Sequence, residues 1–342
     1  MFPCLAKFRD SLGNDAVKLR CLVTKTLETV DQLRAQGESV DTLDTLARLI
    51  HQGRADGKIK KSMVERRPLV VAAKVSVAAL FLFLEREAVQ KGLPGYRQLL
   101  GRVFPDKPKV GFRRAIELSR HRILTFNYDR LFELAFRQYY PGYASTEALY
   151  SPAVLNSGLS LAVPETIEID RSKFSFLKLH GSSGFYGLST ETDPSKKQTK
   201  IEHIHSIPNL KTMPSITDAE FFYPKDSSDP IHSGKPKPAL ITFPHEKDHL
   251  TQYTDNLLPF KNYTPAIWEA AHDFVSQAQE IHILGYSCPD ADAKALESLF
   301  AAAKNCRRYL IENPSPGSVC QRLHLRLPEG FSGEVVCKGV SF

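Results

Sequence analysis

The first 118 residues carry apolar side chains three or four positions apart, the spacing of amphipathic helices. Ser39 is a suitable N-cap for a helix with Leu43, Leu46 and Ile50 on one face. A longer apolar helix is expected from about Pro68. Residues 1–118 are therefore predicted to form a helical N-terminal layer, in which the other helical stretches are Leu19, Leu22, Val23, Leu27, Val30 and Leu33, and Phe112 to Leu118.

The longest apolar run, from Leu69 to Leu84, raises the question of a membrane span. It is shorter than the roughly 20 residues that cross a bilayer, and Lys74 lies near its middle. The N-terminal residues also lack the apolar segment of a secretory signal. These features favour a buried helix in a cytoplasmic protein that does not contact a membrane.

From Arg122 onward, short apolar runs alternate with amphipathic segments, which is typical of strands followed by helices. This alternation favours an α/β fold in which adjacent, mostly parallel strands are covered by helices, here over residues 119–342. Residues 187–237, rich in Ser, Thr, Lys and Pro, would form an irregular insertion or a mobile lid. The predicted strands are 123–126, 174–179, 239–242, 281–284 and 308–311, and the predicted helices 130–139, 265–277 and 291–303.

Composition changes this picture little, but it restricts the partners. The net charge of +7 and the pI of about 9.0 suit an anionic ligand such as a nucleotide. The basic residues are dispersed and not interleaved with aromatic ones, so direct nucleic-acid binding is not favoured. The six cysteines include no C-x-x-C pair, which argues against a zinc ribbon or a small disulfide framework and for reduced thiols.

Polar residues follow the first predicted strand at the edge where parallel α/β sheets bind ligands. Thr125, Asn127 and Asp129 are expected on a common side as the chain leaves the sheet. Thr125 and Asn127 are therefore candidate ligand-binding residues. For Asp129 two interpretations remain open: a ligand contact, or a cap for the helix that follows.

The second strand ends in His180-Gly181, a pair that is compatible with catalysis. Gly181 lets the backbone turn tightly, so His180 can stand open to a cleft. A histidine there can accept a proton near neutral pH and act as a general base. A purely structural histidine is the alternative interpretation.

The last two predicted strands also end in polar residues. Gly285 allows close approach of a ligand to the backbone, and the following helix N-terminus offers free N–H groups to a phosphate. Ser287 can bind that phosphate or cap the helix, and both interpretations remain open. Asn313 carries a short polar side chain that can meet a ribose.

In this order, the runs Asn127 to Asp129, Leu179 to Ser182 and Gly285 to Asp292 resemble the NAD site of the sirtuin family. They are most similar to the prokaryotic SIR2-like branch, and so is the run Pro238 to Lys247. The resemblance covers Arg122 to Asn313 and implies a Rossmann-like, mostly parallel sheet of the sirtuin large-domain type.

The resemblance implies a role for each matching residue. Asn127 would orient the nicotinamide ribose or the attacking water, with Asp129 behind it, and His180 would be the general base. The two catalytic residues, Asn127 and His180, would face one cleft. The remaining cofactor-binding residues would lie around it: Thr125, Gly181, Gly285, Ser287 and Asn313. Ser287 and Asn313 would lie on its rim.

The first departure from the sirtuin pattern concerns metals. Sirtuin deacylases carry paired C-x-x-C zinc ligands after the catalytic histidine, and this chain has no cysteine there. Neither a zinc module nor stoichiometric zinc is expected, and protein deacylation is not favoured. A different metal site is not predicted either, because fitting carboxylates are missing around His203, His205, His245 and His249.

The second departure is the glycine-rich loop G-A-G-x-S, which wraps the pyrophosphate in sirtuins. The nearest run before Thr125 is Ser11-Leu12-Gly13-Asn14, which does not match. The chain would therefore begin after the first sirtuin strand. Two consequences remain open: an N-terminal segment fills the gap, or the sheet is incomplete near the strands ending at Thr125 and Gly285. In the second case, binding of NAD is expected to be weak.

The function expected from this resemblance is an NAD hydrolase of the bacterial antiphage-defence type, acting as a homo-oligomer or with a defence-system partner. Nicotinamide leaves as a neutral molecule, so the site has mainly to stabilise an oxocarbenium-like centre. One alternative is a catalytically impaired NAD or ADP-ribose sensor or partner-binding module. A deacylase or an ADP-ribosyltransferase is the third.

Overall fold

The structure is a computed structural model. It describes residues 1–53, 63–104, 119, 121–139, 161–163, 174–190, 198–203, 216–225, 233–237, 239–243 and 259–340. The helix predicted for residues 112–118 lies outside these ranges, as do His205, His245 and His249.

The N-terminal region is helical, as predicted. Residues of α2, such as Leu19 and Val23, are buried in an apolar cluster that also includes α4. Thr26 of α2 and Ser76 of α4 join the two helices through a buried hydrogen bond of 3.1 Å. The elements are α1 (Phe2–Ser11), the 3-10 turn η1 (Asn14–Ala16), α2 (Val17–Ala35), α3 (Leu43–His51), α4 (Met63–Gln90) and α5 (Pro94–Val103).

Two helix starts differ from the prediction. The cap of α3 is Thr42, whose hydroxyl accepts the Thr45 N–H at 3.1 Å, whereas the Ser39 hydroxyl donates to Asp41. Helix α4 begins at Met63, so Pro68 lies inside it. Burial of the apolar turns after Pro68 offsets the backbone hydrogen bond that a proline removes.

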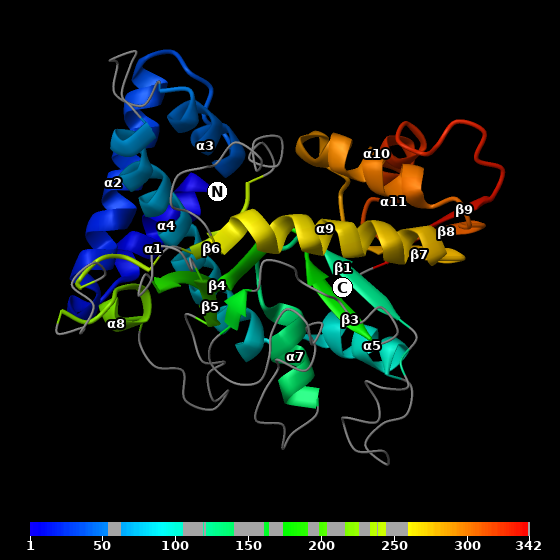
Figure 1. The fold of residues 1–342 in the computed structure, drawn as a ribbon, viewed down its shortest axis with the longest axis horizontal. Helices are drawn as coiled ribbons and strands as arrows, with labels where there is room; N and C mark the ends of the chain where they lie inside the picture. The colour runs from blue at the N-terminus through cyan, green and yellow to red at the C-terminus, as the bar shows by residue number, and fades with distance from the viewer. Residues whose placement is uncertain are drawn as a thin grey trace.

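By length and composition, α4 could cross a membrane over Pro68–Gln90, with a mean hydropathy of 1.9. In this fold, 67% of its most apolar window is buried inside the protein. The helix packs against α2 and α3 and serves as the central helix of the N-terminal layer (Figure 1).

The predicted strands all form, as β1 (Arg122–Thr125), β3 (Ser175–Lys178), β6 (Ala239–Ile241), β7 (Glu280–Leu284) and β8 (Arg308–Asn313). Strands β1 and β3 pair in parallel, with Arg122 opposite Ser175. A second parallel sheet has the order β7-β8-β9, where β9 is Glu334–Gly339. The chain is therefore a mixed α/β protein with short parallel sheets.

The prediction of one sheet with all five strands adjacent is wrong. Among the described residues, β1 pairs with β3 and β7 pairs with β8, and neither sheet includes β6. Strand β6 instead joins an antiparallel sheet of order β2-β5-β4-β6. Its other strands are β2 (Leu161–Val163), β4 (Gly181–Thr190) and β5 (Gln198–His203). The cause is the turn at Leu179-His180, after which the chain enters β4 and pairs antiparallel with β6.

The irregular insertion predicted for residues 187–237 is wrong where the structure describes this segment. It contains the end of β4, all of β5 and the short helix α8 (Asp218–Phe221). Residues 191–197, 204–215 and 226–232 of the insertion lie outside the described part.

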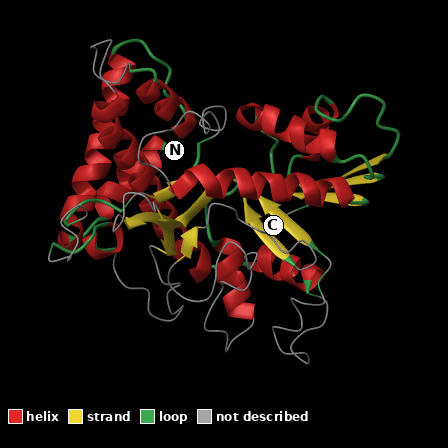
Figure 2. Cartoon of the chain, viewed as in Figure 1, coloured by secondary structure: helices red, strands yellow, loops and turns green. Residues whose placement is uncertain are grey.

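Helices cover the β1–β3 sheet on two sides (Figures 1 and 2). On one side, Phe132 of α7 (Leu131–Tyr139) stacks on Phe176 with ring centroids 4.7 Å apart. On the other, the Trp268 indole of α9 (Pro259–Gln277) donates to the Leu179 carbonyl at 3.1 Å. Helix α10 (Ala293–Ala302) packs on α9, and α11 (Pro316–His324) packs on β8 and β9. This packing brings the carboxyl ends of β1, β3 and β7 together.

Candidate functional site

His180 lies in the turn between β3 and β4 and is almost fully buried, with 3% of its surface exposed. The turn is possible because Gly181 adopts a φ of 79°, in the left-handed region. The His180 carbonyl accepts the Thr242 N–H at 2.8 Å, which fixes the backbone. The imidazole ring therefore projects from a rigid turn.

Residues from the ends of β1 and β7 surround this imidazole. Phe126 contacts it edge-on with centroids 5.0 Å apart, and Tyr128 lies at 5.7 Å. Nε2 lies 3.4 Å from Oδ1 of Asp292. Three of the segments that carry the predicted motifs therefore meet at His180.

Asp292 was not among the predicted site residues, although it belongs to the quoted run Gly285 to Asp292. It ends the 3-10 turn η4 (Asp290–Asp292) and is buried. Its Oδ2 accepts a hydrogen bond of 2.6 Å from the Tyr286 hydroxyl. Burial, and then the negative charge of Asp292, raise the pKa of Tyr286, so the phenol stays protonated and keeps donating. The spacing of Tyr286 and Asp292 in the sequence gives no signal of this contact, because the loop shape creates it.

Tyr286 also joins the two parallel sheets. Its ring stacks on Phe126, with centroids 4.9 Å apart and an interplanar angle of 19°. Phe126 follows β1 and Tyr286 follows β7, so this stack holds the carboxyl ends of strands from different sheets together. The site thus lies where the β1–β3 sheet meets the β7–β9 sheet.

Asn127 is exposed at the end of β1. Its backbone N–H donates to the Thr125 hydroxyl at 3.1 Å. Its side chain forms a hydrogen bond with Tyr96, which partly opposes the effect of burial that raises the pKa of the tyrosine. Thr125 therefore shapes the turn that presents Asn127.

Asp129 accepts a hydrogen bond at the start of α7, which fits the capping interpretation, while the ligand contact stays a prediction. Its Oδ1 accepts the Leu131 N–H at 3.0 Å, at the first turn of α7. Burial raises the pKa of this carboxyl, against the attraction of Lys178 and the hydrogen bond from Leu131. The structure thus gives Asp129 a structural contact beside the site.

The loop after β7 contains Gly285 and Ser287, and Asn313 at the end of β8 supports this loop. Gly285 has a φ of 63°, and its N–H donates to the Glu312 carbonyl at 2.9 Å. Asn313 is buried and donates to the Tyr286 carbonyl at 3.2 Å, so it positions the loop instead of lying exposed on a rim. Gly285 and Ser287 are exposed, and the Ser287 carbonyl accepts a hydrogen bond of 2.8 Å from Arg322.

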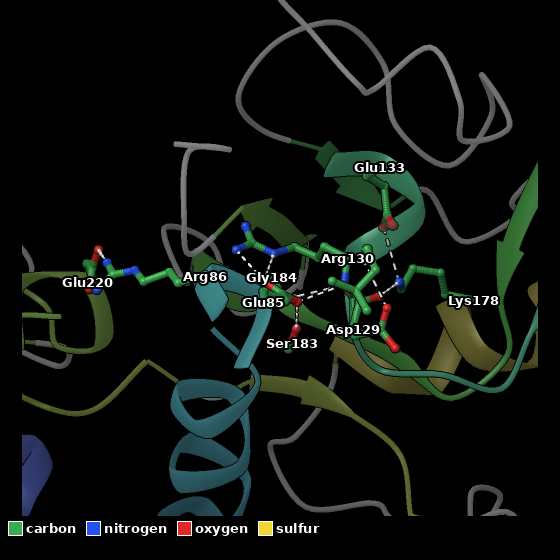
Figure 3. Close-up of polar contacts among 11 residues, drawn as sticks. Glu85, Arg86, Asp129, Arg130, Glu133, Lys178, Ser183, Gly184 and Glu220 are labelled. Carbon is green, nitrogen blue, oxygen red and sulfur yellow. Dashed lines mark hydrogen bonds and ion pairs between the residues drawn. The ribbon is translucent and has the colours of Figure 1, made fainter. Parts of the chain in front are cut away.

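A cluster of buried charges supports the site from the side of α4 (Figure 3). Glu85 of α4 accepts hydrogen bonds from the Arg130 backbone N–H at 2.7 Å and from its guanidinium at 2.8 and 3.0 Å. Lys178 of β3 forms an ion pair of 3.1 Å with Glu133 and donates to the Asp129 carbonyl. All four charged side chains are at most 2% exposed.

This cluster also fixes the chain on both sides of His180. The Ser183 N–H donates to the Tyr128 carbonyl at 2.8 Å, and the Ser183 hydroxyl donates to Glu85 at 3.3 Å. A Cβ on Gly184 would lie 2.4 Å from Cδ of Arg130, so only glycine fits there. The sequence offered only a weak indication of this cluster. Arg130 and Lys178 are charged residues directly beside the motifs at Asn127 and His180, in a chain that is otherwise apolar there.

A disulfide corrects the expectation that all thiols are reduced. Cys320 of α11 and Cys337 of β9 are bonded, with Cα atoms 6.5 Å apart. This pair has no C-x-x-C spacing, because the packing of α11 on β9 brings the two cysteines together. Among the described residues, no group of His, Cys, Asp and Glu has the arrangement of a metal site.

Compared with known proteins, the chain matches no family model, no curated protein and no solved structure.

Proposed function

We propose that this protein hydrolyses NAD at the N-glycosidic bond and releases nicotinamide and ADP-ribose. The observation that carries the proposal is the meeting of three strand ends at His180, through Phe126 from β1 and Asp292 from the loop after β7. The segments that meet are those whose sequences resemble the sirtuin NAD site. Ligands of parallel α/β sheets bind at this edge.

The same contacts support a Rossmann-like, sirtuin-related arrangement. The β1–β3 and β7–β9 sheets are both parallel, and their carboxyl ends meet in the stack of Phe126 on Tyr286. In the proposed arrangement, these sheets are two parts of one ligand-binding layer. The exposed residues beside the stack, Asn127, Gly285 and Ser287, are then available to NAD.

The chemistry needs one base and no metal. As the bond between C1′ of the ribose and the nicotinamide nitrogen breaks, its electron pair leaves with nicotinamide, which becomes neutral. Water adds to C1′ and loses a proton to His180, which acts as the general base. Asn127 orients the ribose or the water, and the net charge of +7 favours the anionic substrate.

A second candidate function is binding of NAD or ADP-ribose without turnover. The observation that favours it is the burial of His180, which leaves 3% of the residue exposed to reach a substrate. A sensor of this kind would use the same residues to bind the nucleotide and would pass the signal to a partner protein. In either case we propose a role in a defence system that responds through NAD.

The test is an assay of NAD loss and nicotinamide release with the His180→Ala variant. We expect a fall of at least about 100-fold, typical for the loss of a general base. His324→Ala, an exposed histidine at the end of α11, is the matched control and should keep full activity. Circular dichroism should show that both variants are folded.

Three other outcomes separate the candidates. Equal activity of His180→Ala and the wild type would refute the assigned base. Tight NAD binding by calorimetry with no product from the wild type would select the sensor. Global unfolding of His180→Ala would favour a structural histidine.

A further inference from the structure

We propose that Asp292 is the positioning residue of His180: it holds the imidazole in one tautomer and stabilises its protonated form. This inference deepens the proposed function, and it rests on that function only where it concerns NAD cleavage. The supporting geometry is independent of the function. Both residues are buried, and Nε2 of His180 lies 3.4 Å from Oδ1 of Asp292, a charge contact without hydrogen-bond geometry.

The pair is anchored on both sides. Asp292 accepts the Tyr286 hydroxyl at 2.6 Å, so one of its oxygens is held while the other faces His180. The histidine ring is held by Phe126 and Tyr128, and its backbone is fixed by Thr242. Neither side chain can turn away without breaking these contacts.

This geometry has a consequence for the proton. A carboxylate beside Nε2 favours the tautomer that carries its hydrogen on Nε2. Nδ1 then bears the lone pair, and in the proposed hydrolysis it would be the atom that accepts the proton from water. When it does, the ring becomes a cation, and the adjacent carboxylate compensates for the cost of a buried positive charge.

Other charged and titratable groups around the pair come from the end of β1, from the loop after β7, and from α11 with the turn that follows it. Tyr128 follows β1, and Tyr286 and Cys288 belong to the loop after β7. Asp290 is bound by Arg326 of the C-terminal region at 2.7 Å, and Arg322 of α11 binds the Ser287 carbonyl. Burial raises the pKa of Tyr286 and of Cys288, so both stay neutral near pH 7. Among the described residues, Asp292 supplies a charged side chain within ion-pair distance of His180.

The first experiment is a nuclear magnetic resonance titration of the protein labelled with ¹⁵N-histidine, in which the His180→Ala variant identifies the His180 signals. In the wild type we expect the nitrogen shifts of the Nε2–H tautomer. A Nδ1–H tautomer would overturn the proposal. This measurement needs neither NAD nor a variant of Asp292.

The second experiment compares Asp292→Asn with Tyr286→Phe. Asparagine retains the size and an acceptor for Tyr286 but removes the charge, so the titration midpoint of His180 should fall by about one pH unit. Tyr286→Phe keeps the carboxylate and the ring stack, so the midpoint should stay closer to that of the wild type. An unchanged midpoint in Asp292→Asn would overturn the proposal, whether or not the protein cleaves NAD.

The third readout is the rate of NAD cleavage against pH. Asp292→Asn should lower kcat at least about tenfold with KM little changed, and should move the acidic limb of the profile to lower pH. Asp292→Glu, which restores the charge, should recover part of the rate. A shifted His180 midpoint in a protein that cleaves no NAD would support the pair and refute the proposed hydrolase. A kcat and a profile equal to those of the wild type would refute the role of Asp292 in catalysis.

Discussion

At the scale of single residues, the contribution of Asp129 to the free energy of unfolding depends on pH. Its carboxylate caps α7 through the Leu131 N–H at 3.0 Å. Because burial raises the pKa of this carboxyl in the folded protein, the folded state holds the proton more tightly than the unfolded chain. The stability contributed by this difference is present at low pH and is lost as the pH rises through the raised pKa.

Asp129→Asn should therefore match or exceed the wild type in free energy of unfolding at pH 7, since it keeps the capping acceptor without the charge. Asp129→Ala, which lacks the cap, should lose about 1 kcal/mol. Urea unfolding at several values between about pH 4 and pH 8 measures both, and the gap between Asn and wild type should close towards acid. If the Asn variant is as unstable as the Ala variant at pH 7, the carboxylate charge is stabilising instead.

The sequence predicted correctly which site residues follow strand ends, but it did not predict which side chains contact them. His180, Asn127 and Gly285 do follow strand ends, because apolar runs and a glycine mark those ends. Asp292 and Glu85 were missed as site residues. Their importance comes from burial beside a partner that is distant in the sequence, which no local pattern encodes.

At the scale of elements, α11 connects the C-terminal strand to the site. Cys320 bonds it to β9, while Arg322 donates to the Ser287 carbonyl in the loop after β7. The disulfide closes a loop of 17 residues. In the chain-entropy model, a loop of this size contributes about 3 kcal/mol.

Cys337→Ser, or reduction of the wild type, should therefore lower the free energy of unfolding by about 2–4 kcal/mol. Thermal unfolding with and without reductant measures this difference. Cys21→Ser, at an exposed free thiol, is the control and should change little. Six reactive thiols in the denatured, unreduced protein would contradict the bond.

The elements that were predicted correctly are those whose own sequence has a strong pattern of apolar residues. The N-terminal helices and the five apolar strands carry enough apolar side chains to be recognised locally. Strand β4 starts Gly181-Ser182-Ser183-Gly184, a run that resembles a loop, and β5 is Gln198–His203. These strands form because neighbouring strands satisfy their backbone hydrogen bonds, which composition does not reveal.

At the scale of the whole molecule, strand pairing could not be predicted, because adjacency depends on contacts far apart in the sequence. The expectation of an incomplete sheet concerned the strands ending at Thr125 and Gly285. Within the described residues, β1 and β7 pair with different partners and not with each other. Side-chain contacts, such as Phe126 on Tyr286, join them instead.

The apolar interior is also divided. One cluster holds α1 to α4 with β6, and a second holds α5, α7, β1, β3, α9 and the C-terminal elements. Helix α4 contributes to both, with Leu82 in the first and Val89 in the second. Glu85 lies between them and binds Arg130, which makes the buried ion pair a polar connection between the two clusters.

Removing Glu85 should therefore destabilise the protein and separate the unfolding of the two clusters. Glu85→Ala leaves the Arg130 guanidinium buried without its carboxylate, which should cost about 3–5 kcal/mol. The double variant Glu85→Leu with Arg130→Met should recover most of this loss, because apolar side chains can replace a buried pair.

Trp268, the single tryptophan, reports on the second cluster by fluorescence, and far-ultraviolet circular dichroism reports mainly on the helices. The two unfolding curves should coincide for the wild type and for Glu87→Ala, an exposed control on α4, and should diverge for Glu85→Ala. Coincident curves and wild-type stability in Glu85→Ala would show that other contacts, such as apolar packing along α4 and the β4–β6 pairing, couple the two clusters without this ion pair.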